Sequence, residues 1–284
     1  AGEIMADRGA LAGVADEGGW WPDFAANEDA LDTLAKAIEA AGYRNGEVVI
    51  SLDIAASEFG ENGRYRLGLE DREFDTGTWI DRLGEWIARY PILSIEDPVG
   101  EDDPEGMRAF TEAFGDRMQI IGDDYLVTDP ARVTDAVADG ACNAVLLKPN
   151  QAGTISRTRA AMETAKAAGW GMVISARSGE TEDTIIVHLA TGWNTGQLKV
   201  GSFARSERMA KWNEALRIEE ALDERESFIV RGRFGLDGSG KGKTFSALGE
   251  QLGLSKERVR QLCQRGLEKL GEIARPYETL FSTT

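Results

Sequence analysis

The chain has little cysteine, little histidine and no long apolar run, and each shortage excludes a class of protein. Its two cysteines, Cys142 and Cys263, lack metal-ligand spacing and favour a reduced, cytoplasmic setting. The single histidine, His188, lies in an apolar helical pattern, where we expect it to pack in the interior. No apolar run approaches the roughly 18 residues of a membrane-spanning helix, and residues 1–9 lack the pattern of a signal peptide. We therefore expect no membrane association.

Basic residues are also scarce, and charge is distributed unevenly along the chain. The net charge is −17. Residues 1–222 hold 21 basic and 40 acidic side chains, whereas residues 223–284 hold 11 and 9. The strongly acidic residues 1–222 should repel nucleic acid, whereas residues 223–284 need not. This difference in charge predicts two domains, 1–222 and 223–284.

Residues 27–222 alternate short apolar runs with amphipathic helical patterns, whereas the glycine-rich residues 10–24 read as a loop. The steps of about 25 residues between runs are typical of parallel βα units, so we expect an incomplete α/β barrel. The expected strands are Val48–Leu52, Ile92–Ile95, Met118–Ile121, Ala144–Leu147, Met172–Ser175 and Gln197–Val200. The helical patterns include Thr78–Arg89, Pro130–Asp139, Thr154–Ala168 and Thr184–Thr191.

Charged or polar side chains close these strands, where parallel α/β folds place their chemistry. Asp53, Glu96 and Asp123 would form an all-oxygen site suited to Mg²⁺. Lys148 and Lys199 would complement an anionic substrate, or act as a base. The alternative is that each acid merely caps the helix that follows it.

Residues 1–222 resemble the C-terminal barrel of enolase. The resemblance is carried by ADEGG (15–19), SLDIAASEF (51–59), SIEDP (94–98), GDD (122–124), LLKPNQAGT (146–154), SARSGETEDT (175–184) and residues 198–222. It implies six of the eight βα units of a TIM-type barrel and the dehydration of 2-phosphoglycerate to phosphoenolpyruvate.

The resemblance also implies a role for individual residues. Asp53, Glu96 and Asp123 would hold Mg²⁺, and Lys148 would remove the proton next to the substrate carboxylate. Glu17 would help the hydroxyl leave, and Lys199 would bind the carboxylate side. The substrate phosphate would lie against two residues, Arg177 and Ser178.

The sequence departs from the enolase pattern in two ways. Ala176 stands where the family has histidine, which removes an imidazole contact to the substrate. The family's N-terminal domain and first two barrel strands have no counterpart here, so the parallel sheet has an open edge. A homo-oligomer is one arrangement that would cover this edge.

Residues 223–284 predict a small all-α domain. The glycine-rich stretch 235–243 reads as a connector and lacks the spacing of a phosphate-binding loop. After it come a short apolar helix, a turn at Gly253 and a second helix that Ser255 would cap. We expect Val259, Leu262, Leu267 and Leu270 to face inward. The alternative to a DNA-binding helix-turn-helix is a hairpin that packs on the barrel.

This second part resembles region 4 of primary-type bacterial sigma factors, through LDERESFIVRGRFGLDG (222–238) and TFSALGEQLGLSKERVRQL (244–262). The resemblance implies promoter DNA and RNA polymerase as partners. The residues it would place on DNA are Lys256, Glu257, Arg260 and Gln261. Lys256 stands where the family usually has arginine, so bidentate recognition of guanine is lost.

Two functions therefore stay open from the sequence. One is an enolase-like, Mg²⁺-dependent lyase. The other is a transcription-associated protein that binds DNA through its last 62 residues and carries the barrel as an inactive body.

Overall fold

A computed structural model describes residues 1–44, 46–234 and 242–274. The chain divides into two compact units. The first contains Ala1–Gly179 and Thr195–Arg205, and the second contains Glu180–Asn194 and the residues from Ser206 onward. None of the described helices has the length and apolar character needed to cross a membrane.

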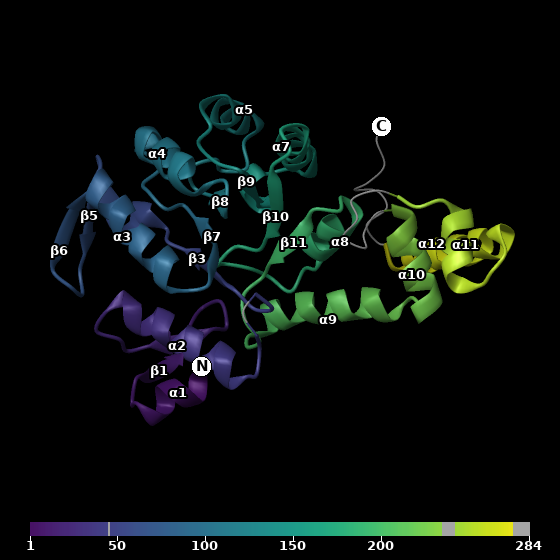
Figure 1. The fold of residues 1–284 in the computed structure, drawn as a ribbon, viewed down its shortest axis with the longest axis horizontal. Coiled ribbons are helices and arrows are strands. Elements are labelled where there is room, and N and C mark those ends of the chain that lie inside the picture. Colours follow the sequence, from purple (N-terminus) through teal and green to yellow (C-terminus); the bar gives the residue numbers. More distant parts are fainter. Residues whose placement is uncertain (45, 235–241, 275–284) are drawn as a thin grey trace. The chain divides into compact units, whose positions relative to one another are not determined.

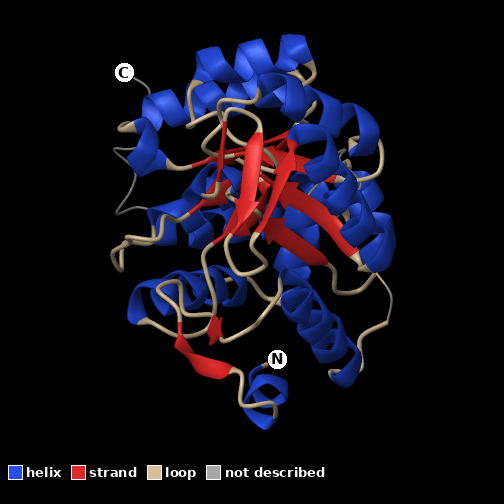
Figure 2. Cartoon of the chain, turned by 90° about the vertical axis from the view of Figure 1, so that its left-hand side faces the viewer, coloured by secondary structure: helices blue, strands red, loops and turns tan. Residues whose placement is uncertain are grey.

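The first unit is built on a parallel sheet of six strands, which Figures 1 and 2 show with helices along its outside. Its order is β11-β10-β9-β8-β7-β3, so sequence neighbours lie side by side. The strands are β3 (Ile50–Asp53), β7 (Ile92–Glu96), β8 (Gln119–Gly122), β9 (Ala144–Leu147), β10 (Gly171–Ser175) and β11 (Gly196–Lys199). This sheet confirms the prediction of an incomplete TIM-type barrel.

Helix-capping residues fix where the covering helices begin. Asp75 caps α3 (Thr76–Arg89) by accepting the Thr78 N–H, and Asp129 caps α5 (Pro130–Asp139). Gly140 ends α5 in the left-handed conformation, with φ +65°. The other helices on this sheet are α4 (Pro104–Phe114), the single-turn α6 (Pro149–Ala152) and α7 (Ile155–Ala167).

Two small antiparallel sheets contain strands that the sequence did not predict. The expected loop 10–24 was wrong, because β1 (Leu11–Val14) and β2 (Trp20–Pro22) pair across the ADEGG turn. A short α1 (Gly2–Asp7) precedes this hairpin and α2 (Asn27–Ala40) follows it. The strands β4 (Gly60–Glu61), β5 (Arg64–Leu67) and β6 (Arg72–Asp75) form a meander after the 3₁₀ turn Ala56–Glu58.

The second unit is helical, with α8 (Ile185–Gly192), α9 (Ser206–Glu220), α10 (Glu224–Phe234), α11 (Phe245–Leu252) and α12 (Lys256–Ala274). Asp223 and Glu226 begin α10 with a reciprocal capping box, since each carboxylate accepts the other's backbone N–H. His188 on α8 is buried as predicted, and its Nε2 lies 2.9 Å from Glu214 Oε1 on α9. Burial lowers the pKa of His188 against the opposing effect of Glu214.

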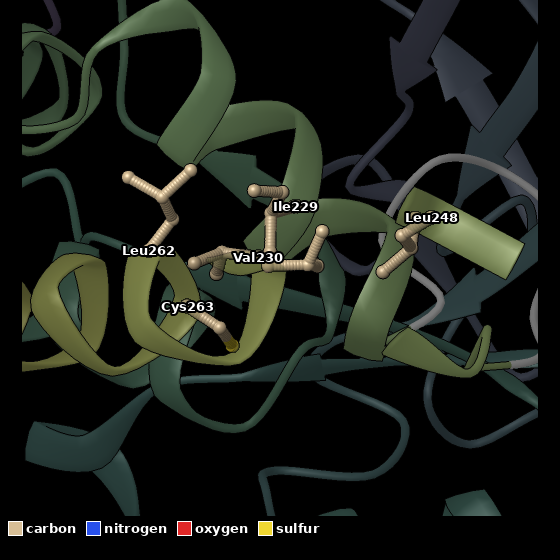
Figure 3. Packing of buried hydrophobic residues seen from close by; sticks show 6 residues of the cluster. Ile229, Val230, Leu248, Leu262 and Cys263 are labelled. Carbon is tan, nitrogen blue, oxygen red and sulfur yellow. The ribbon is translucent and has the colours of Figure 1, made fainter. Parts of the chain in front are cut away.

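Helices α10, α11 and α12 share one apolar core, shown in part in Figure 3. Its buried members are Ile229, Val230, Leu248, Val259, Leu262 and Cys263. The expected inward position of Leu267 was wrong, because its side chain is 37% exposed. Gly266 takes the inward position, and a Cβ there would lie 3.1 Å from Val230 Cγ2. The expected connector 235–243 lies largely outside the described residues.

Candidate functional site

The carboxyl ends of five strands bring the predicted strand-end residues to the same end of the sheet, and we call these residues the ring: Asp53, Glu96, Asp123, Lys148 and Lys199. Asp53 and Glu96 end β3 and β7 and are paired in register. Asp123 directly follows β8, Lys148 directly follows β9, and Lys199 is the last residue of β11.

Lys199 joins the two outermost strands of the sheet. Its Nζ donates to Asp53 Oδ2 at 2.7 Å and to the two Glu96 oxygens at 2.8 and 2.9 Å. Since β3 and β11 are the two ends of the strand order, these bonds require a sheet that curls back toward itself. The lysine thus neutralises part of the charge of two neighbouring carboxylates.

Lys148 forms a further ion pair of the ring. Its Nζ donates to Asp123 Oδ2 at 2.5 Å, and both side chains are largely buried. The other oxygen, Asp123 Oδ1, is buried and accepts no hydrogen bond from the described residues. A buried carboxylate oxygen without a donor is a costly group, and a bound cation would satisfy it.

Negative charge is in excess at this edge. Burial raises the pKa of Glu96 to about 8, and the adjacent Asp53 carboxylate adds to the rise against the opposing effect of Lys199. Burial alone would lower the pKa of Lys199, but Glu96 and Asp53 raise it overall. Burial also raises the pKa of Asp124, with Asp123 adding to it. A cation in this ring would relieve the repulsion between the carboxylates.

The donor atoms fit a hard divalent cation, because all are carboxylate oxygens. Among the described residues, one convergent group is Asp97, Asp123 and Asp124, with an oxygen from each within 4.8 Å of the others. It shares Asp123 with the predicted set Asp53, Glu96 and Asp123. In this structure the Lys199 ammonium forms ion pairs with the other two predicted ligands, Asp53 and Glu96.

Glu17 lies in a loop that is attached to the chain after β11. Its carbonyl oxygen accepts the Ser202 N–H at 2.8 Å. Gly18 has φ +79°, and a Cβ there would lie 2.2 Å from the Ala204 oxygen, so only glycine permits this approach. The loop is therefore fixed by its backbone, and Glu17 is held at the same edge as Lys199.

Arg177 and Ser178 follow the end of β10 and are exposed. Ala176, just before them, is buried, and its N–H donates to the Lys199 carbonyl at 2.9 Å. The structure thus places the predicted phosphate-binding residues on the loop next to the strand of Lys199.

Sequence reasoning missed two buried residues: Asp97, which bonds to the backbone of Asp123, and Tyr65, which holds the chain after β7. Asp97 is buried and accepts the Asp123 and Asp124 N–H groups. Tyr65 of the unpredicted meander is fully buried and accepts the Gly100 N–H at 3.1 Å. The only sequence signal was a second acid directly after the strand-ending Glu96.

The predicted DNA-contacting residues lie on the first two turns of α12. Lys256, Glu257, Arg260 and Gln261 are all exposed there. Gly253, with φ +66°, ends α11, and Ser255 accepts the Arg258 N–H at the start of α12. Glu257 and Arg260 form an ion pair at 2.7 Å on this surface. The arrangement is a helix-turn-helix with a polar leading face.

Two family models match the chain. Residues 3–234, well over half of the chain, match the model described as "Enolase, C-terminal TIM barrel domain". Residues 220–272 match the model described as "Sigma-70, region 4". The two matches overlap over residues 220–234, which include the whole of α10.

Proposed function

Because this chain belongs to the family of enolase C-terminal TIM-barrel domains, we propose that its ring dehydrates 2-phosphoglycerate to phosphoenolpyruvate. The observation that supports the proposal best is the ring itself. Strand-end carboxylates and lysines meet in it, and Asp123 Oδ1 is buried without a donor among residues 1–44, 46–234 and 242–274.

The proposed roles follow from the charge and place of each side chain. Lys148 Nζ, in its neutral amine form, takes the proton from the carbon next to the substrate carboxylate, and protonated Glu17 gives its proton to the departing hydroxyl, so that water leaves. Lys199 lies beside the substrate carboxylate, and Arg177 with Ser178 binds the phosphate. Asp53, Glu96 and Asp123 would hold Mg²⁺, which would stabilise the negative charge that develops on the substrate carboxylate.

Enzyme assays with two variants test this proposal. We expect Lys148→Ala and Glu17→Gln to reduce formation of phosphoenolpyruvate by at least about 100-fold, as measured by its ultraviolet absorbance. Lys166→Ala, at an exposed lysine of α7, is the matched control and should retain activity. Equal activity of Lys148→Ala and wild type would contradict the proposed base.

Ligand-dependent unfolding tests the binding site separately from turnover. A ligand at 100 times its Kd raises the free energy of unfolding by about 2.7 kcal/mol when it binds only the folded state. We expect Mg²⁺ and 2-phosphoglycerate each to raise the melting temperature. A melting temperature indifferent to both would contradict an assembled site.

The exposed leading face of α12 supports a second function, binding of promoter DNA together with RNA polymerase. The exposed hydrogen-bond donors there belong to Lys256, Arg260 and Gln261. The apolar core beneath them contains Leu248, Val259 and Leu262. The match to region 4 of sigma-70 factors supports DNA as the ligand.

Fluorescence anisotropy with a labelled promoter duplex tests this function. We expect the affinity to fall steeply with salt and to fall further when Arg260 and Gln261 are changed to alanine. An affinity that is unchanged in the double variant would show that α12 does not contact the duplex.

Both cysteines are free and buried, which supports the cytoplasmic setting of either function.

A further inference from the structure

Asp97 lies at the junction of three strands whose ends carry the ring carboxylates. It follows Glu96 at the end of β7 and is 3% exposed. Its φ is +41°, in the left-handed region that is uncommon for a residue other than glycine. A buried carboxylate in such a backbone conformation requires compensating bonds.

The hydrogen bonds of Asp97 reach the loops after both neighbouring strands. The Asp123 N–H donates to Oδ1 at 2.9 Å, and the Asp124 N–H donates to Oδ2 at 2.7 Å. The Asp97 N–H donates to the Ile121 carbonyl at 3.0 Å, and the Asp97 carbonyl accepts the Ala56 N–H at 3.3 Å. One residue therefore connects the chain after β3, β7 and β8.

These bonds fix the backbone on which Asp123 stands, whereas the Asp123 side chain is bound on one side only. Lys148 holds Oδ2, and Oδ1 is buried with no donor in the part of the chain that the structure describes. The orientation of that free oxygen is therefore set by the backbone of residues 123 and 124, which the Asp97 carboxylate holds at two points.

We propose that Asp97 is a positioning residue, whose carboxylate orients Asp123 for a divalent cation without itself becoming a ligand. This inference rests on the proposed metal site. Both Asp97 oxygens already accept a backbone N–H, which distinguishes Asp97 from Asp123 within the convergent group of three aspartates. Residues that orient metal ligands typically change metal affinity when they are altered.

Mn²⁺ binding followed by electron paramagnetic resonance tests the inference without any assay of turnover. In Asp97→Asn, the side-chain amide meets a backbone N–H where the second oxygen had accepted one. We expect the Kd for Mn²⁺ to rise about 10- to 100-fold. The number of waters on bound Mn²⁺, measured by line broadening in ¹⁷O-water, should be unchanged. Asp102→Asn, at an exposed aspartate, is the matched control and should leave the Kd unchanged.

Two results for the variant would overturn the positioning role. An unchanged Kd in Asp97→Asn would mean that Asp97 does not influence the site, and one additional water on Mn²⁺ would mean that Asp97 is a ligand. A wild-type chain that binds no Mn²⁺ would overturn the proposed metal site as well. Wild-type binding together with an unchanged variant would overturn this inference alone.

Hydrogen exchange of the wild-type chain gives a test that needs no folded variant. The amides of residues 123 and 124 donate to Asp97 in the metal-free structure, so we expect them to be protected before Mn²⁺ is added. Protection that develops only after Mn²⁺ is added would overturn the inference, because the loop would then be ordered by the cation.

Discussion

The Lys199 ammonium lies 2.7 Å from the Asp53 carboxylate, although their strands are at opposite ends of the sheet order. This pair, together with the contact from Lys199 to Glu96, links the first and last strands of a sheet that has only six members. In a flat sheet the two edges would be far apart, so the contact depends on the curl of the strands. Lys199 therefore joins strand-end residues from opposite ends of the strand order, although the sheet does not close into a full barrel.

Removal of the Lys199 charge should destabilise the metal-free chain. Lys199→Met leaves the buried Glu96 carboxylate without its cationic partner, which we expect to lower the free energy of unfolding by about 1–3 kcal/mol. Addition of Mg²⁺ should restore more stability to this variant than to the wild type, because the cation replaces the lost positive charge. Chemical unfolding with and without Mg²⁺ measures both effects.

Lys166→Met is the matched control for this substitution, since Lys166 is exposed on α7 and lies in the same unit. It should change the free energy of unfolding by less than about 0.5 kcal/mol. If Lys199→Met were as stable as wild type in metal-free buffer, the ion pairs of Lys199 would contribute nothing to the fold.

Most strand ends could be predicted from the sequence because they are short apolar runs closed by a charged or polar residue. Ala144–Leu147, followed by Lys148, shows this well, since the predicted and observed bounds agree. The contact between Lys199 and Asp53 could not be derived from these runs, because it depends on the accumulated curl of six strands. The contacts of Asp97 could not be predicted for a similar reason, because its partners are backbone groups 26 and 27 residues away.

The missed strands and the wrong inward residue have local causes. The strands β1 and β2 lie in a stretch rich in glycine, and composition alone favoured a loop there. On α12 the apolar pattern admits either residue 266 or 267 after Leu262, and leucine was the natural choice. The close packing of α12 against Val230 favours a residue without a side chain at position 266, because a Cβ there would lie 3.1 Å from Val230 Cγ2.

The two leucines on α12 should therefore respond differently to truncation. Leu262 is 6% exposed within the core of the three helices, so Leu262→Ala should cost about 2–4 kcal/mol. Leu267 is 37% exposed, so Leu267→Ala should cost less than about 1 kcal/mol. Hydrogen exchange of α12 measures both. Equal loss of protection in the two variants would contradict the observed orientation of this helix.

Glu226 should make the stability of this core depend on pH. Burial would raise the pKa of its fully buried side chain, but hydrogen bonds from Lys269 and Arg265 outweigh burial and lower it to about 2. The unfolded chain binds a proton near pH ~4.3, so the folded state keeps its charge to lower pH. The stabilisation is therefore complete well above that pH and is lost as the pH falls toward about 2.

Hydrogen exchange of α12 between pH 7 and 2.5 would locate this effect, after correction for the intrinsic exchange rate. In Glu226→Gln the pH-dependent part should disappear, and protection at pH 7 should fall toward the acidic value of the wild type. Glu224→Gln, at an exposed neighbour outside the ion-pair group, should keep the wild-type profile. A variant at position 226 that retains the wild-type pH dependence would contradict the assignment to this carboxylate.

The ion pair between Glu257 and Arg260 should weaken binding of DNA. Their side chains are 61% and 55% exposed, and the carboxylate would lie next to phosphates in a bound duplex. Glu257→Gln removes this negative charge and releases the guanidinium for a phosphate contact. We expect a higher affinity for duplexes of any sequence and a salt slope steeper by about one counterion. Anisotropy titrations at several salt concentrations measure both.

The matched control is Glu268→Gln, an exposed acid on the same helix but about three turns beyond Glu257. Both substitutions remove one negative charge, so a general change in net charge would raise the two affinities equally. A larger effect at position 257 would place the duplex against the first turns of α12. Equal effects, or a lower affinity of Glu257→Gln for every duplex, would contradict that placement, because the carboxylate would then not oppose the phosphates.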